Sequence, residues 1–126
     1  MSLEDRLAPP PYRTVTPRMF VDDVEKAVAF LRDVFGAEAT IEPGRPTPVR
    51  IGDSIVLVSS VTEREASPAF LYIYVDNADS TYQRAVAAGA ESIEAPLDTP
   101  YGDRRAMFRD AFGNIYQAAH RHIVIS

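Results

Sequence analysis

An internal repeat constrains the fold of this chain more than any other feature. Two apolar strand ends run into acidic or amide side chains, a Gly-Ala-Glu segment occurs twice, and a Gly-Asp turn twice precedes a strand-like run. The matched segments are 19–23 with 73–77, 36–38 with 89–91, and 52–53 with 102–103. The offset between the copies drifts only from 54 to 50 residues. Three matches in the same order predict a duplicated chain whose halves form the same unit.

The first half predicts a strand, a helix and three further strands. A strand is expected at 14–21, and Asp22 then caps a helix with Glu25 at the capping-box spacing. The apolar residues of this helix follow the helical period, and Gly36 ends it. They are Val24, Ala27, Val28, Leu31, Val34 and Phe35. The later strands are predicted at 37–42, 47–51 and 54–60.

The second half follows the same plan. The pattern predicts a strand at 69–75 and a helix at 78–88 that Gly89 ends. Further strands are expected at 90–95, 104–109 and 115–124, with a hairpin turn at 110–114. The sequence thus predicts an N-terminal arm at 1–13 and one domain at 14–126, with repeats at 14–62 and 69–126 and a polar linker at 63–68.

Composition excludes several classes of function. No apolar run is long enough to span a membrane and no signal-peptide pattern is visible, so we expect a cytoplasmic protein without a membrane partner. A net charge of −5 without a basic cluster argues against nucleic acid as a partner. The absence of cysteine excludes disulfides, thiolate metal sites and cysteine nucleophiles. The single lysine, Lys26, is expected on an exposed helix face, which argues against Schiff-base chemistry.

Two segments of the second half carry a resemblance to a known family. Residues 101–104 (Tyr-Gly-Asp-Arg) and 109–116 (Arg-Asp-Ala-Phe-Gly-Asn-Ile-Tyr) resemble a signature of the vicinal oxygen chelate superfamily, the glyoxalase/bleomycin-resistance/dioxygenase proteins, with Ala111 where proline is usual. The similarity runs from about Thr14 to His120. It implies an α+β fold in which two βαβββ repeats curl a mixed sheet into a cup. In such proteins the cup holds a small molecule, and it forms through a homodimer or paired modules.

The resemblance also says where a metal would be. Family enzymes hold a divalent ion with His and Glu side chains, and the ion stabilises charge on two vicinal substrate oxygens. Carried over by motif, the ligand positions fall on Thr16, Phe70, Gln117 and the strand 55–59, which has no His, Asp or Glu. A phenyl ring cannot bind a metal, and a neutral amide binds it weakly. The resemblance therefore implies no metal site and no cofactor, as in the drug-binding members of the family.

Strand alternation indicates which side chains would line the cup. Residues that share the parity of Thr16, Phe70 and Gln117 point to the same side of the sheet. Such a wall is aromatic and mostly apolar with a few polar groups, which is typical of small-molecule pockets. The predicted ligand-binding residues are Thr16, Arg18, Phe20, Phe70, Tyr72, Tyr74, Tyr101, Arg104, Met107 and Gln117. Ile115 and Ala119 share this parity, and Arg105 or Arg109 is a further candidate.

Structural roles compete with ligand contact at several of these positions. Phe20 and Phe70 could instead fill a closed core. Arg104 could hold its loop through Asp103 or Asp110 rather than touch a ligand. These alternatives stay open at the level of sequence.

The remaining acidic and imidazole groups have simpler explanations. Asp22, Asp23 and Asp76 are interpreted as helix caps rather than as paired catalytic carboxylates. His120 and His122 are two residues apart, so both are expected to face away from Gln117 and from the cup, as exposed side chains.

Three functions are compatible with these patterns. The leading hypothesis is a metal-independent dimeric protein that binds a planar or aromatic organic molecule, such as a drug, in the cup. An enzyme, either a glyoxalase-like lyase or isomerase or a dioxygenase, would need metal ligands at other positions or acid–base chemistry by Tyr72, Tyr74 or Arg18. A closed domain that serves only as an interaction module is the third.

Overall fold

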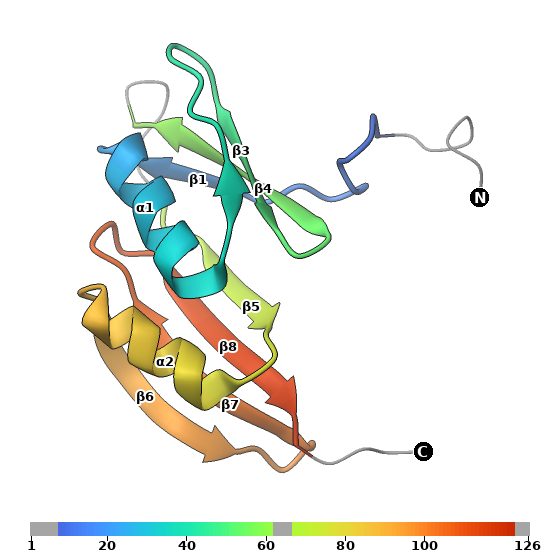
Figure 1. The fold of residues 1–126 in the computed structure, drawn as a ribbon, viewed down its shortest axis with the longest axis vertical. Helices are drawn as coiled ribbons and strands as arrows, with labels where there is room; N and C mark the ends of the chain where they lie inside the picture. The colour runs from blue at the N-terminus through green and yellow to red at the C-terminus, as the bar shows by residue number, and fades with distance from the viewer. Residues whose placement is uncertain (1–7, 62–66, 123–126) are drawn as a thin grey trace. The chain divides into compact units, whose positions relative to one another are not determined.

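A computed structural model describes residues 8–61 and 67–122 (Figure 1). The linker predicted at 63–68, the N-terminal arm and the end of the last predicted strand thus lie partly outside the described residues. The chain divides into two compact units between Ser67 and Pro68. The last turn of the first helix, Asp33–Phe35, belongs to the second unit. Each unit has the order βαβββ, so the predicted duplication and the α+β class are confirmed.

The first unit contains a four-stranded mixed sheet with the order β1-β4-β3-β2. Its elements are β1 (Arg18–Val21), α1 (Val24–Phe35), β2 (Glu38–Ala39), β3 (Thr47–Ile51) and β4 (Ser54–Ser60). Strand β1 pairs in parallel with β4, and the other neighbours are antiparallel. Helix α1 ends at Gly36, whose φ of 65° lies in the left-handed region that glycine adopts without strain.

The second unit repeats this topology with the strand order β5-β8-β7-β6. Its elements are β5 (Phe70–Tyr74), α2 (Ala78–Ala87), β6 (Glu91–Asp98), β7 (Asp103–Arg109) and β8 (Ile115–Arg121). The predicted hairpin turn at 110–114 joins β7 to β8. Asp110 organises it, because its carboxylate accepts hydrogen bonds from the backbone N–H groups of Phe112 and Asn114 and from the Tyr116 hydroxyl.

The hydrophobic core of the second unit lies on one side of its sheet. Phe108 and Tyr116 are fully buried, and their ring centroids are 5.7 Å apart. Phe35, in the last turn of α1, lies 6.1 Å from Phe108 and 5.5 Å from Tyr116. Helix α2 contacts β6, β7 and β8, and Figure 1 shows it lying across this sheet. One face of the sheet is therefore committed to packing.

Both helices are capped by the residue directly before them. Asp23, not Asp22, caps α1, and its carboxylate accepts from the Lys26 N–H at 3.0 Å. Asn77, not Asp76, caps α2 through an equivalent bond to the Ser80 N–H. The expectation that Asp22 and Asp76 are caps is therefore wrong by one residue in each repeat, while the prediction for Asp23 is confirmed.

Removing either cap is expected to destabilise the fold. Asp23→Ala and Asn77→Ala should each lower the free energy of unfolding by about 1 kcal/mol, because an orphan N–H at the helix start loses its acceptor. Asp22→Ala and Asp76→Ala are the matched controls and should change it by less than about 0.5 kcal/mol. Urea unfolding followed by circular dichroism measures all four. Equal losses at Asp22 and Asp23 would contradict the assigned cap.

No helix in the described part of the chain is long and apolar enough to cross a membrane.

Candidate functional site

The second sheet has two chemically different faces. Arg104 and His120 are register partners that both contact α2, so they define the side on which the helix lies. Alternation places Met107 and Gln117 on the opposite side, and the β5–β8 register adds Tyr72 to that pair. We call this side the aromatic face. It carries Phe70, Tyr72 and Tyr74 from β5, Met107 from β7, and Gln117 from β8.

Large aromatic side chains on this face are accessible to solvent. Phe70 is 59% exposed, Tyr72 38% and Tyr74 62%, and Tyr101, just before β7, is 50% exposed. The rings of Tyr72 and Tyr74 pack edge to face with centroids 5.5 Å apart. The alternative that Phe70 fills a closed core is therefore wrong. Exposed aromatic rings gathered on one sheet face are typical of a surface that binds a ligand or a partner protein.

A buried carboxylate holds two of these rings. The Asp103 side chain is fully buried and accepts hydrogen bonds from the hydroxyls of Tyr72 (2.7 Å) and Tyr74 (2.9 Å). Its other oxygen pairs with Arg121 Nη1 at 2.8 Å. Because the two phenols share one buried acceptor, their hydroxyl ends are held in place by the same carboxylate.

Tyr101 and Arg105 extend this network along the sheet. The Tyr72 and Tyr101 hydroxyls are 3.2 Å apart, and Arg105 Nη1 donates to the Tyr101 hydroxyl at 3.0 Å. The other amino group of Arg105 pairs with Glu94 on β6 at 2.7 Å. The Arg105 Nε is buried and is the one side-chain polar atom of the described residues that is buried without a hydrogen-bond partner.

The network shifts the pKa values of its members. The hydrogen bonds from Tyr72 and Tyr74 and the Arg121 guanidinium hold the pKa of Asp103 below its usual value. Burial and the bond to Asp103 raise the pKa of Tyr72, and the bond to Asp103 raises that of Tyr74. Asp103 is thus an anion at neutral pH.

Stability should therefore depend on the ionisation of Asp103. A carboxylate whose folded pKa is depressed contributes stability that is present above its unfolded pKa, about 3.9, and is lost as the pH falls through the folded pKa. We expect the thermal midpoint of the protein to fall on acidification below about pH 4. In Asp103→Asn this acid limb, the fall of the midpoint with falling pH, should be shallower. Asp22→Asn, at an exposed aspartate before α1, should keep the full acid limb. An unchanged limb in Asp103→Asn would contradict this role.

Arg104 does not lie with the other predicted ligand-binding residues. It faces α2, where its guanidinium forms a two-pronged ion pair with Asp79 (2.7 and 2.9 Å) and a third bond to Asp98 (3.0 Å). The carboxylates of Asp79 and Asp98 raise the pKa of Arg104, and Arg104 in turn lowers that of Asp79. The partners expected from the sequence, Asp103 and Asp110, are therefore replaced by Asp79 and Asp98. Arg104 joins β7 to the start of α2.

His120 also faces α2, as the alternation predicts. Its Nδ1 accepts a hydrogen bond from the Ala78 N–H at 2.8 Å, so the imidazole satisfies a donor at the helix N-terminus. His120 is consequently half-buried and not exposed, which corrects the expectation. His122 lies beyond β8, exposed and 3.5 Å from Asp98.

The predicted residues of the first repeat belong to the first unit. Arg18 and Phe20 share one face of β1, and the Arg18 guanidinium lies 5.0 Å from the centre of the Phe20 ring. The Arg18 Nε also donates to Ser59 Oγ at 3.1 Å. Thr16 precedes β1 and is half-buried. Arg18 thus makes within the unit the cation–π contact that the sequence suggested for a ligand.

The side chains at the family's metal positions do not fit a metal. They present a hydroxyl at Thr16, a phenyl ring at Phe70, an amide at Gln117, and in β4 no imidazole or carboxylate at all. Within residues 8–61 and 67–122, no three His, Asp or Glu side chains come close enough together to hold an ion. These four positions therefore offer no set of metal ligands.

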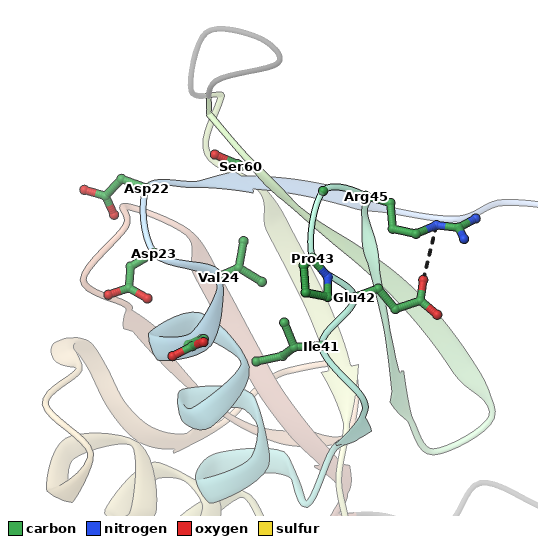
Figure 2. A pocket seen from close by; sticks show the side chains of 10 residues that line it. Asp22, Asp23, Val24, Ile41, Glu42, Pro43, Arg45 and Ser60 are labelled. Carbon is green, nitrogen blue, oxygen red and sulfur yellow. Dashed lines mark ion pairs between the residues drawn. The ribbon is translucent and has the colours of Figure 1, made fainter.

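An open pocket lies in the first unit, and none of the residues predicted to bind a ligand lines it. It has a volume of about 600 Å³ and is formed by the start of α1 and the segment 41–45 (Figure 2). Figure 2 shows the carboxylates of Asp22, Asp23 and Glu42 around it, with Arg45 paired to Glu42 at 3.4 Å. Sequence patterns do not predict this pocket, because its acidic residues lie at positions typical of turns and helix caps.

Comparison with known proteins identifies the class. The family model of the Glyoxalase/Bleomycin resistance protein/Dioxygenase superfamily matches residues 13–117. The chain therefore belongs to this superfamily, as the resemblance and the duplicated topology imply.

Relatives and solved structures are similar over most of their length. Mb0911c of Mycobacterium bovis is 28% identical, with 79% of this chain and 78% of that protein covered. TioX from Micromonospora sp. ML1 is 25% identical with a TM-score of 0.74, over 86% of this chain and 98% of TioX. A glyoxalase/bleomycin resistance protein/dioxygenase family enzyme from Burkholderia phytofirmans PsJN has a TM-score of 0.73 at 24% identity, covering 84% and 96%. The last likeness concerns the fold alone.

Proposed function

We propose that this protein binds a planar or aromatic organic molecule on the aromatic face without the help of a metal. The observation that carries the proposal is the set of exposed rings, Phe70, Tyr72 and Tyr74, on one sheet face whose centre is the Gln117 amide. Rings fixed by a buried carboxylate lose little conformational entropy when a ligand stacks on them. In the same proposal the protein acts as a homodimer in the cytoplasm.

The chemistry of the face supports binding better than catalysis. Tyr72 and Tyr74 both donate to Asp103, and their raised pKa values make them poor general bases near neutral pH. Arg18, the other candidate for acid–base chemistry, is engaged with Phe20 and Ser59. Asp103 itself is fully buried behind the two phenols.

Metal removal tests the proposal. Elemental analysis of the purified protein should find no stoichiometric transition metal, and EDTA should leave both the thermal midpoint and the binding of an aromatic probe, followed by tyrosine fluorescence quenching, unchanged. A bound ion stabilises the native state by linkage, so its loss would lower the midpoint. A stoichiometric ion whose removal abolishes probe binding would instead favour a metal-dependent lyase, isomerase or dioxygenase.

A further inference from the structure

We infer that the ligand of the aromatic face is an uncharged aromatic molecule whose polar group is recognised by Gln117, an inference that rests on the proposed function. It concerns the class of ligand. The acidic net charge of the chain suggests a cationic ligand, but the local arrangement of charges on this face indicates otherwise.

Every charged side chain that the strand register places on this face has an opposite charge beside it. The three ion pairs all connect neighbouring strands: Asp103 with Arg121 at 2.8 Å, Arg105 with Glu94 at 2.7 Å, and Arg109 with Glu91 at 3.1 Å. The face therefore carries three positive and three negative groups and is locally neutral. No net charge is left over to complement a charged ligand.

An ionic ligand would be destabilised at such a surface. It would lose part of its hydration on stacking against the rings, and it would gain a counter-charge only by separating one of the existing pairs. The Asp103 carboxylate is fully buried and the Arg105 side chain is only 18% exposed, so separating either pair would leave a poorly solvated charge. A neutral ring system loses no ionic hydration and requires no ion pair to separate.

The hydroxyl hydrogens of the tyrosines are also committed. A carboxylate can only accept, so Tyr72 and Tyr74 must each donate their hydrogen to Asp103. The hydrogen in the contact between the Tyr72 and Tyr101 hydroxyls must then come from Tyr101, whose oxygen accepts from Arg105. All three phenols donate within the protein, and they offer a ligand ring surface rather than hydrogen-bond donors.

Gln117 is the uncharged polar group that remains for recognition. It lies between Tyr72 and Met107 in the register, at the centre of the face, and is partly exposed. Its carboxamide, both a donor and an acceptor, makes no hydrogen bond to any described residue. A neutral ligand with an amide, phenol or similar group would pair with Gln117 while its ring stacks on the tyrosines.

Three probes with one ring system and different charges test the inference. We would titrate the full-length protein with 2-naphthol, 2-naphthoate and 2-naphthylmethylammonium by calorimetry at neutral pH in EDTA. Neutral 2-naphthol should bind at least about tenfold more tightly than either ion. Gln117→Leu should reduce this preference, because the polar group of the probe then loses its partner.

Removing one member of an ion pair should change the ranking. Glu94→Gln frees the Arg105 guanidinium and should raise the affinity for 2-naphthoate by about tenfold. Glu94→Asp keeps the charge and should keep the original ranking, as should Glu25→Gln, which removes one exposed carboxylate from α1.

The possible outcomes separate the two proposals. If an ionic probe binds as tightly as 2-naphthol, the inference on ligand class is wrong while the proposed binding function stands. If no probe binds, both are wrong. Concentration-dependent association that Phe70→Ala abolishes would then show that a second copy of the chain covers the face.

Discussion

Phe108→Ala is expected to lower the free energy of unfolding by about 3–5 kcal/mol, the usual loss when a fully buried phenylalanine is truncated. The Phe108 ring is fully buried and stacks with Tyr116 and Phe35 on the α2 side of the second sheet. Truncation leaves a cavity between two aromatic rings that cannot collapse without moving β8. Chemical denaturation with a fixed m-value measures the loss.

Phe70→Ala is the matched control on the opposite face. The same atoms are removed, but the Phe70 ring is 59% exposed, so the expected loss is below about 1 kcal/mol. The contrast depends only on which side of the sheet each ring faces. Similar losses for the two variants would mean that the aromatic face is packed as a second core.

Tyr72→Ala is expected to weaken the binding of a neutral aromatic probe by about tenfold to a hundredfold, equivalent to roughly 1.4–2.8 kcal/mol. The Tyr72 ring lies beside Gln117 in the register and packs edge to face on Tyr74. Its removal deletes a stacking surface and frees one acceptor site of Asp103 to water. Fluorescence or calorimetric titration gives the ratio of dissociation constants.

A second tyrosine provides the comparison. Tyr82 lies on α2 and donates to Ser92, so Tyr82→Ala removes the same side chain without touching the aromatic face. Its affinity for the probe should equal that of the unchanged protein. Equal losses in Tyr72→Ala and Tyr82→Ala would remove the aromatic face from consideration as the binding site.

Periodicity predicts the fold of this chain well because local and long-range preferences agree. The strands at 47–51 and 54–60 are found within the predicted bounds, since the Gly52-Asp53 turn leaves no other register. Strand β1 is shorter than expected because Pro17 has no N–H for the ladder. The prediction of Asp22 as the cap of α1 is off by one residue, because adjacent aspartates satisfy the same N-cap preference. Only the backbone geometry distinguishes them.

The site is predictable only in part. Alternation groups Phe70, Tyr72 and Gln117 on one face, as the register has them, while their contact with a ligand remains a prediction. Asp103 escapes notice because in sequence it reads as a turn residue, and its partners lie 18 to 31 positions away. Arg104 and Arg105 could not be assigned to a face from the sequence, because the start of β7 decides the parity and the turn before it conceals that start.

Metal-independent binding at the aromatic face can be located by a nuclear magnetic resonance titration of the full-length protein with 2-naphthol in EDTA. We expect saturable shifts of backbone amides in β5, β7 and β8, centred on Tyr72, Met107 and Gln117, and loss of those shifts in Tyr72→Ala. Shifts confined to other parts of the chain, such as the acidic pocket formed by α1 and residues 41–45, or shifts that need an added divalent metal, would contradict it.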